Sequence, residues 1–417
     1  MSAKGLPFGQ VLAVSAGNAL GFYDFLTYSY FSKQIGETFF PAANPGNRLL
    51  LSLAVFGVGF FTRPIGAVVL GTMGDKIGRK PALIISFMLM GFGILGLALT
   101  PSYASIGIAA PLLVIFFRLL QGFALGGEVG PTTAYMLEAA PPNRRGLYAS
   151  FQATTQDFAT LCAGIVGFTL ANYLTAGQLQ DYGWRIAFLI GASIIPFVLI
   201  ARRNLEETFA MAADPAAPPV KMRPHLRLAF LGLIIIGTQT ILSYTLGYMT
   251  TFAQTSLNIS ANIAFIATII NGGSGFLFDS VSGWLSDKYG RKPVMIIPTI
   301  GLILSTIPVF FMMVQGGTTA AFLGGVAIIA LFGAFNQPPV LVALTEALPS
   351  ALRSRGLAIV YAVAISVFGG STQFTIQLLI NLTHNTMMPA WILTPVSALG
   401  LIAMFLLPET APVKAKK

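Results

Sequence analysis

Long apolar runs follow one another along almost the whole chain, and short polar segments separate them. Twelve of these runs are long enough to cross a hydrocarbon core about 30 Å thick as a helix. The predicted spans are residues 12–31, 49–70, 82–100, 110–137, 147–174, 184–201, 227–254, 262–285, 294–314, 319–347, 355–381 and 388–407. The runs lack the alternation of a membrane β-barrel, and helices satisfy their own backbone polar groups in lipid. The pattern therefore predicts an all-α polytopic membrane protein.

Composition supports a membrane protein without a separate soluble domain. Hydrophobic residues make up 55% of the 417 residues, and the mean hydropathy is +0.77. The first apolar run lacks a small-residue cleavage site, so we expect it to be retained as a helix. Cys162 is the only cysteine, which excludes an intramolecular disulfide.

Basic residues are distributed unevenly between the two sets of loops. If both termini are cytoplasmic, the loops on that side hold 19 of the 24 lysines and arginines. Cytoplasmic loops of membrane proteins carry such an excess. We therefore expect both termini in the cytoplasm. The net charge of +10 follows from this topology and needs no nucleic-acid partner.

Two charged sequences are nearly identical although 212 residues separate them. They are GDKIGRKP (74–81), after the second span, and SDKYGRKP (286–293), after the eighth span. Other pairs keep nearly the same offset: Glu138 with RRG (144–146) and Glu346 with SRG (354–356), and LEET (205–208) and LPET (407–410). The chain is thus predicted to be a duplicated six-helix unit, with halves at residues 1–201 and 227–417 and a proline-containing linker at 202–226.

The repeated charged sequences predict a latch that holds one conformation. An acid at a helix end, followed by glycine and bases, can bind neighbouring helix ends by charge-assisted hydrogen bonds. The predicted latch residues are Asp75, Arg79, Glu138, Arg145, Asp287, Arg291, Glu346 and Arg355. The alternative, that the bases only determine topology, does not explain the acids and glycines at these positions.

The sequences GTMGDKIGRK (71–80) and GWLSDKYGRK (283–292) resemble the loop signature G-x-x-x-D-[RK]-x-G-R-[RK] of the major facilitator superfamily. The resemblance covers the whole chain and implies two halves that move about a central site. Segments that resemble the metabolite:proton symporter family are GNALGFYDF (17–25), GFFTRPIGAVVLGTMGDKIGRK (59–80) and RLLQGFALGGEVG (118–130). FNQPPVLVALTEALP (335–349) and SVFGGSTQ (366–373) are closest to the citrate and tricarballylate carriers of that family.

This resemblance implies proton-coupled uptake of a small organic acid, above all a tricarboxylate, across the bacterial inner membrane. It also implies a monomer in the lipid bilayer that is driven by the proton gradient without a cofactor. His225, His384 and Cys162 cannot form a metal cluster or a Cys/His nucleophile pair, and no G-x-x-x-x-G-K-[ST] phosphate loop occurs. We therefore expect no metal, no ATP-driven step and no enzyme activity.

Six ionisable residues fall inside the predicted spans, where an unpaired charge is costly and therefore indicates function. They are Asp24, Arg63, Arg118, Glu128, Asp157 and Asp279. The resemblance to sugar porters implies that Asp24 accepts the proton and that Arg118 is its partner, and the alternative is a static ion pair. Glu128 either relays a proton or pairs with a neighbour.

The remaining charged residues have less defined roles. Arg63 is followed by Pro64 and is expected to be structural. The family's first-helix pattern reads G-N-x-x-E-[WFY]-[FY]-D, whereas this chain has Gly21 at the place of the glutamate. Asp157 or Asp279 is a candidate replacement for that glutamate. The departure leaves both the ion stoichiometry and the substrate open.

The central helices carry polar residues suited to binding an organic acid. The predicted binding residues are Asn18, Tyr28, Arg118, Gln121, Gln152, Gln156, Tyr244, Tyr248 and Asn336. Further polar residues on these helices and their neighbours are Asn271, Gln337, Thr372, Gln373 and Gln377. For each of them, holding helices together is the alternative role. Gly57, Gly59, Gly122, Gly126 and Gly130 are expected to permit close helix packing.

Physical chemistry alone does not select citrate as the substrate, because the spans hold two arginines against four acids. A dicarboxylate or a zwitterion, of the ketoglutarate or proline/betaine type, carries less net negative charge and would be repelled less by these acids. An exporter of drugs or metabolites with the same fold is a further alternative, although residues 147–174 lack the prolines of the usual exporter motif. A non-transporting membrane receptor is the alternative from another class.

Overall fold

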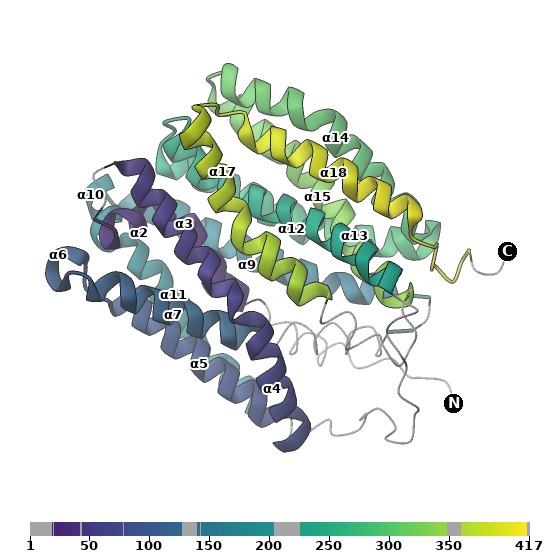
Figure 1. Cartoon of the computed structure of the whole chain (residues 1–417), viewed down its shortest axis with the longest axis horizontal. Coiled ribbons are helices and arrows are strands. Elements are labelled where there is room, and N and C mark those ends of the chain that lie inside the picture. Colours follow the sequence, from purple (N-terminus) through teal and green to yellow (C-terminus); the bar gives the residue numbers. More distant parts are fainter. Residues whose placement is uncertain are drawn as a thin grey trace.

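The computed structural model describes residues 19, 21–41, 44–77, 79–126, 140–141, 143–203, 226–347 and 360–414. Within these residues all regular secondary structure is helical. The helices form two groups that lie side by side, one up to residue 203 and the other from residue 226 onward (Figure 1). These groups are called the N-terminal and C-terminal halves below.

The N-terminal half begins with a helix over residues 21–30, which continues after Phe31 into α2. Its other elements are α2 (Ser32–Phe39), α3 (Pro45–Phe61), α4 (Arg63–Ile77), α5 (Arg79–Leu99), the short α6 (Tyr103–Ile106), α7 (Ala109–Gly126), α9 (Arg145–Tyr173), α10 (Ala176–Gln178), the π-helical turn η1 (Leu179–Gly183) and α11 (Trp184–Arg203).

The C-terminal half consists mainly of long helices. They are α12 (Leu226–Thr255), α13 (Ala261–Tyr289), α14 (Arg291–Gln315), α15 (Thr319–Ala347), a helix that runs from residue 360 through the π-helical turn η3 (Ile365–Gly369) into α17 (Gly370–Thr383), and α18 (Met388–Leu406).

Each of the twelve predicted spans contains a described helical segment, so the predicted all-α fold is confirmed. Eight of the described helices are long and apolar enough to cross a membrane by themselves. The helix α9 is not among them, and it carries Gln152, Gln156 and Asp157. It packs between the two halves (Figure 1), where polar side chains find partners that lipid does not offer.

The first helix extends beyond the predicted end at residue 31, because its polar residues are satisfied inside the bundle. The hydroxyl of Ser32 donates to the carbonyl oxygens of Tyr28 (3.0 Å) and Ser29 (2.8 Å). The side-chain amide of Gln34 donates to Gln254 Oε1 in the C-terminal half, at 3.3 Å. A boundary placed where hydropathy falls was therefore wrong by about two turns.

The predicted second span, 49–70, was too short at both ends and missed a break at Thr62, between α3 and α4. Proline has no N–H, so Pro64 cannot donate to the carbonyl oxygen of Phe60, four residues earlier. The hydroxyl of Ser366 in the C-terminal half donates to that oxygen instead, at 3.0 Å. The break thus creates a hydrogen bond between the halves.

Glycines allow helix backbones to touch in this fold. A Cβ on Gly122 would overlap the carbonyl oxygen of Gly59, and one on Gly272 of α13 would overlap the backbone nitrogen of Leu161 in α9. The predicted packing role is confirmed for Gly57, Gly59, Gly122 and Gly126, and Gly130 lies outside the described residues. The contact between α9 and α13 is the most extensive one between described helices, and it joins the two halves.

Candidate functional site

A central cavity of about 100 Å³ lies between the two halves. Its polar lining consists of Tyr30, Gln156, Asp157 and Thr160 from the N-terminal half, and Gln239, Thr240, Ser243, Tyr244, Asn271, Gln337 and Tyr361 from the C-terminal half. A smaller adjoining cavity of about 30 Å³ shares Asp157, Gln239, Ser243, Asn271 and Gln337 with it. Both halves therefore contribute to one site.

Helical spacing explains why these side chains face the cavity together. In α9 the lining residues Ala153, Gln156 and Thr160 are three or four residues apart, and so are Ala153, Asp157 and Thr160, so all four lie toward one face. In α12 the lining residues Gln239, Ser243 and Gly247 recur every fourth residue. Each helix thus presents a single polar stripe to the cavity.

The lining chemistry suits a small polar molecule. Four side-chain amides provide N–H donors for carboxylate or hydroxyl oxygens, and the tyrosine rings offer apolar faces for a carbon skeleton. No lysine, arginine or histidine belongs to the lining formed by the described residues, and Asp157 is its only ionisable group besides the tyrosines.

Arg118 lies behind this lining, fully buried among aromatic rings. Its guanidinium carbon is 4.1 Å from the centre of the Phe25 ring and 4.5 Å from that of Tyr28. Its Nη1 donates to Gln121 Oε1 at 2.9 Å, and Nη2 donates to the carbonyl oxygen of Phe56 at 3.5 Å. Arg118 is therefore held by cation–π contacts and by neutral acceptors, which leave its charge available.

Arg63 packs against the same ring and connects this layer to the cavity. Its guanidinium carbon is 4.1 Å from the centre of Phe25 and 4.3 Å from that of Phe60. Its charge also interacts with Tyr244, a residue of the cavity lining. Two buried cations thus share one aromatic ring.

Asp24 is buried near Arg118, but the two do not form an ion pair. Only 1% of Asp24 is exposed, and neither carboxylate oxygen has a hydrogen-bond partner among the described residues. Its charge interacts with that of Arg118. A carboxyl group in this position can exchange a proton when the distance to the arginine changes. The coupling roles of both residues remain predictions.

The predicted binding residues do not all lie in one place in the structure. Gln156 and Tyr244 line the cavity. Tyr28 and Gln121 surround Arg118 instead, and Gln152 is buried in α9 away from the cavity lining. Tyr248 donates a hydrogen bond to Gln377, and Asn336 donates to Thr299 Oγ1, so neither lines the cavity. Asn18 and Glu128 lie outside the described residues.

Sequence reasoning missed six polar residues of the lining: Tyr30, Thr160, Gln239, Thr240, Ser243 and Tyr361. For α12, the spacing of Gln239 and Ser243 by four residues, continued by Gly247, was the available signal. Sequence reasoning also predicted Asn336 as a binding residue, whereas the neighbouring Gln337 occupies the lining. Adjacent residues point about 100° apart on a helix, so adjacent amides cannot be distinguished without knowing how the helix is rotated.

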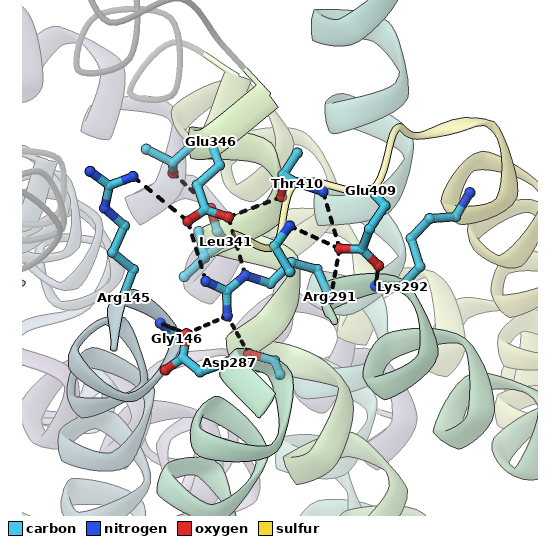
Figure 2. Close-up of polar contacts among 12 residues, drawn as sticks. Arg145, Gly146, Asp287, Arg291, Lys292, Leu341, Glu346, Glu409 and Thr410 are labelled. Atoms are coloured by element: carbon cyan, nitrogen blue, oxygen red, sulfur yellow. Dashed lines mark hydrogen bonds and ion pairs between the residues drawn. The ribbon is translucent and has the colours of Figure 1, made fainter. Parts of the chain in front are cut away.

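At one end of the bundle, Arg291 gathers the predicted latch residues of the second repeat (Figure 2). Arg291 is fully buried; its Nη1 donates to Asp287 Oδ1 at 2.7 Å, and Nε and Nη2 donate to Glu346 at 3.1 and 3.2 Å. Asp287 also accepts hydrogen bonds from the backbone N–H groups of Gly146 (2.8 Å) and Leu147 (2.9 Å).

These contacts, here called the Arg291 network, cross between the halves. The two N–H groups belong to the first turn of α9, where the helix dipole favours a carboxylate. Arg145 in the same turn is 3.9 Å from Glu346. The side chains of Asp75 and Arg79, and all of Glu138 and Arg355, lie outside the described residues. Their roles in the latch stay predictions.

Glu409 is a residue of this network that sequence reasoning missed. Its carboxylate accepts hydrogen bonds from the backbone N–H groups of Arg291 (2.9 Å) and Lys292 (3.1 Å), at the start of α14 (Figure 2). Thr410 donates to Glu346 at 3.0 Å. The preceding Gly290 has a φ of 107°, where a Cβ would be strained and would meet Glu409. The similarity between LEET (205–208) and LPET (407–410) was the available indication that Glu409 has a structural role.

The opposite end of the bundle is also bridged between the halves. Asn262 donates to Asn172 Oδ1 at 3.2 Å, and Gln34 donates to Gln254 Oε1 at 3.3 Å. These neutral bonds join the ends away from the Arg291 network. Ser29, next to the lining residue Tyr30, donates to Gln373 Oε1 at 2.8 Å and adds a further bond between the halves. The cavity is therefore flanked by contacts between the halves at both ends, ionic at one and neutral at the other.

Comparisons with known proteins agree with this architecture. The family model described as Major Facilitator Superfamily matches residues 14–370 and 228–417. The chain is 36% identical to a citrate-proton symporter of Salmonella typhi over 96% of this chain and 94% of that protein. It is 35% identical to a citrate-proton symporter of Klebsiella pneumoniae over 96% and 92% of the two chains, and 33% identical to an alpha-ketoglutarate permease of Escherichia coli over 87% and 85%.

The fold is also similar to that of a solved transporter. A crystal structure of a D-xylose-proton symporter superposes with a TM-score of 0.75, covers 97% of this chain and 98% of its own, and is 21% identical. At that identity the likeness concerns the fold alone. With two six-helix halves, a central cavity and a family match over nearly its whole length, the chain belongs to the major facilitator superfamily.

Proposed function

We propose that this chain is a secondary transporter that takes up citrate, or a closely related tricarboxylate, together with protons. The observation that carries this proposal is the similarity over 96% of the chain to two citrate-proton symporters. The cavity between the halves supports it, because its amides and phenols can bind carboxylate oxygens. Movement of the halves about this cavity would expose it to each side in turn.

The electrostatics of the site favour a partly protonated substrate. Four amides can donate to carboxylates, but no cation of the described residues lines the cavity, and Asp157 lies in its wall. A fully ionised tricarboxylate would meet uncompensated repulsion there.

Asp24 and Arg118 are the proposed proton-coupling pair. Among the described residues, the buried carboxyl has no hydrogen-bond partner, and the guanidinium nearby is held by stacking rather than by an acid. A shift of the helix over residues 21–30 against α7 would change their separation and thus the protonation of Asp24. Glu128 remains a candidate relay. The proton gradient is the proposed energy source, with no cofactor.

The loop charges support an orientation with both termini and the Arg291 network on the cytoplasmic side of a bacterial inner membrane. The network would then hold the cytoplasmic ends of the halves together, and uptake would require it to open. A monomer contains the whole cavity and both sets of contacts between the halves.

Uptake by purified protein in proteoliposomes tests the proposal. With an alkaline interior, labelled citrate should accumulate above its external concentration, and a protonophore should abolish the accumulation. Competition by tricarballylate, ketoglutarate, succinate, proline and betaine defines the substrate class. Accumulation of betaine or ketoglutarate without any citrate uptake would refute citrate as the substrate and assign the transporter to that other substrate class.

Two neighbouring amides provide a matched pair of variants for the cavity. Gln337→Leu removes a lining donor, so the apparent KM for citrate should rise. Asn336→Leu removes the bond to Thr299 instead and should lower thermal stability more than affinity. If the KM responds to Asn336 and not to Gln337, the binding site lies on the other face of α15.

A further inference from the structure

The two acids of α9 and α13 meet at the contact between the halves. Asp157 Oδ2 lies over Gly275, where an added Cβ would overlap it, and Gly275 is one helical turn before Asp279. Asp279 therefore lies on the stretch of α13 that Asp157 contacts, within one helical turn of that contact. One acid comes from each half, so the distance between them depends on how the halves are arranged.

No basic group of the described residues is bound to this pair. Asp279 is fully buried, and neither of its oxygens has a hydrogen-bond donor among the described residues. The flanking hydroxyls of Thr154 and Ser280 bond to each other, at 3.1 Å. Asp157, in contrast, lines both cavities and therefore gives the pair a route to a proton donor.

The groups that surround the pair are polar but uncharged. The titratable residues that line the cavity with Asp157 are Tyr30, Tyr244 and Tyr361, and the remaining polar groups from α12, α13 and α15 are Gln239, Ser243, Asn271 and Gln337. The described charged side chains on the helices packed against α9 and α13 are bound elsewhere or exposed. Arg291 and Glu346 bind each other, Arg185 donates to the carbonyl oxygens of Ala98 and Thr100, and Lys292 donates to that of Phe405, while Arg227 and Asp181 are exposed.

Two ionised carboxylates cannot hydrogen-bond, because each offers only acceptors, and they repel in a medium of low polarity. A single proton removes the repulsion and provides the missing O–H donor. When the halves separate, each carboxyl would be hydrated on its own and the proton would be released to water.

We propose that Asp157 and Asp279 share one proton across the contact between the halves and form a second proton-binding site, distinct from Asp24. This inference rests on the proposed proton-coupled transport. It makes the α9–α13 contact itself dependent on protonation: the proton is bound when the halves touch and released when they part. Transport would then carry one more proton per cycle than Asp24 alone provides.

The first test needs no substrate. Infrared spectra of the wild-type protein near neutral pH should contain the carbonyl band of a protonated carboxyl group, and Asp279→Asn should remove one such band. Asp181→Asn, which changes an exposed acid in η1, is the matched control and should leave the spectrum unchanged. Asp157→Asn gives the same comparison if Asp279→Asn does not fold. A wild-type spectrum without any such band would overturn the proposal.

The second test measures protons moved per citrate in proteoliposomes. The ratio should fall by one in Asp279→Asn, since the amide permanently imitates the protonated partner, and should be unchanged in Asp181→Asn. If coupled transport persists with an unchanged ratio and spectrum, the shared proton is refuted while the proposed function stands. If the wild type shows the band but no citrate transport, the proposed function fails instead. Loss of the band on adding sodium would mean that the pair binds a metal cation, which also refutes the inference.

Discussion

Replacing Asp287 by asparagine should weaken the contact between the halves at the end that holds the Arg291 network. The carboxylate accepts two backbone N–H groups of α9, and these two bonds are lost when the halves separate. Its bond to Arg291 lies within the C-terminal half, so losing that bond affects both conformations alike. Only the two bonds to α9 therefore shift the conformational equilibrium.

The magnitude follows from these two bonds. A hydrogen bond to a charged group contributes about 1.5–3 kcal/mol. Asparagine retains one acceptor oxygen but presents an amide N–H₂ to the second donor, so about one bond is lost. The population in which the Arg291 network joins the halves should fall by about 10- to 150-fold relative to the population in which the halves are separated at that end. Roughly 1.4 kcal/mol corresponds to a factor of ten.

Cysteine labelling measures this shift. In a Cys162→Ser background, Gln239→Cys places one thiol in the cavity. A membrane-impermeant reagent, added to inverted vesicles, should label it faster when Asp287→Asn is also present. Lys288→Gln, an exposed neighbour outside the network, is the control. Equal labelling of the Asp287→Asn and control proteins would refute the latch, and faster labelling only in right-side-out vesicles would reverse the proposed orientation.

Three further variants test other parts of the structure. Asp24→Asn should abolish proton-driven accumulation but retain citrate exchange without a gradient; full accumulation would remove Asp24 from coupling. Arg118→Lys should impair transport several-fold although the charge is kept, because lysine has no planar guanidinium to stack on Phe25; an unchanged KM and turnover would make stacking irrelevant. Gly122→Ala should lower thermal stability by about 1–3 kcal/mol through overlap with the facing backbone, whereas Gly71→Ala, with open space around it, should not; similar melting temperatures would contradict the packing argument.

The latch residues show which contacts a repeated sequence can predict and which it cannot. The duplicated motif identified Asp287, Arg291 and Glu346, and the structure brings these three together. Glu409 escaped notice because its role depends on the path of the chain after α18, which returns to the start of α14. A short echo such as LPET marks a position but not the partner that it will contact.

The sequence by itself determined which segments are helices, that the chain is duplicated, and where the charged loops lie. These are local properties, since an apolar run in lipid has to satisfy its own backbone. Only the tertiary structure decided that Gln337 rather than Asn336 lines the cavity, that Arg118 stacks on aromatic rings behind it, and that Asp157 meets Asp279. A membrane helix is apolar both toward lipid and toward its neighbours, so hydropathy does not reveal its rotation. Close packing of small residues and a few hydrogen bonds between helices determine that rotation.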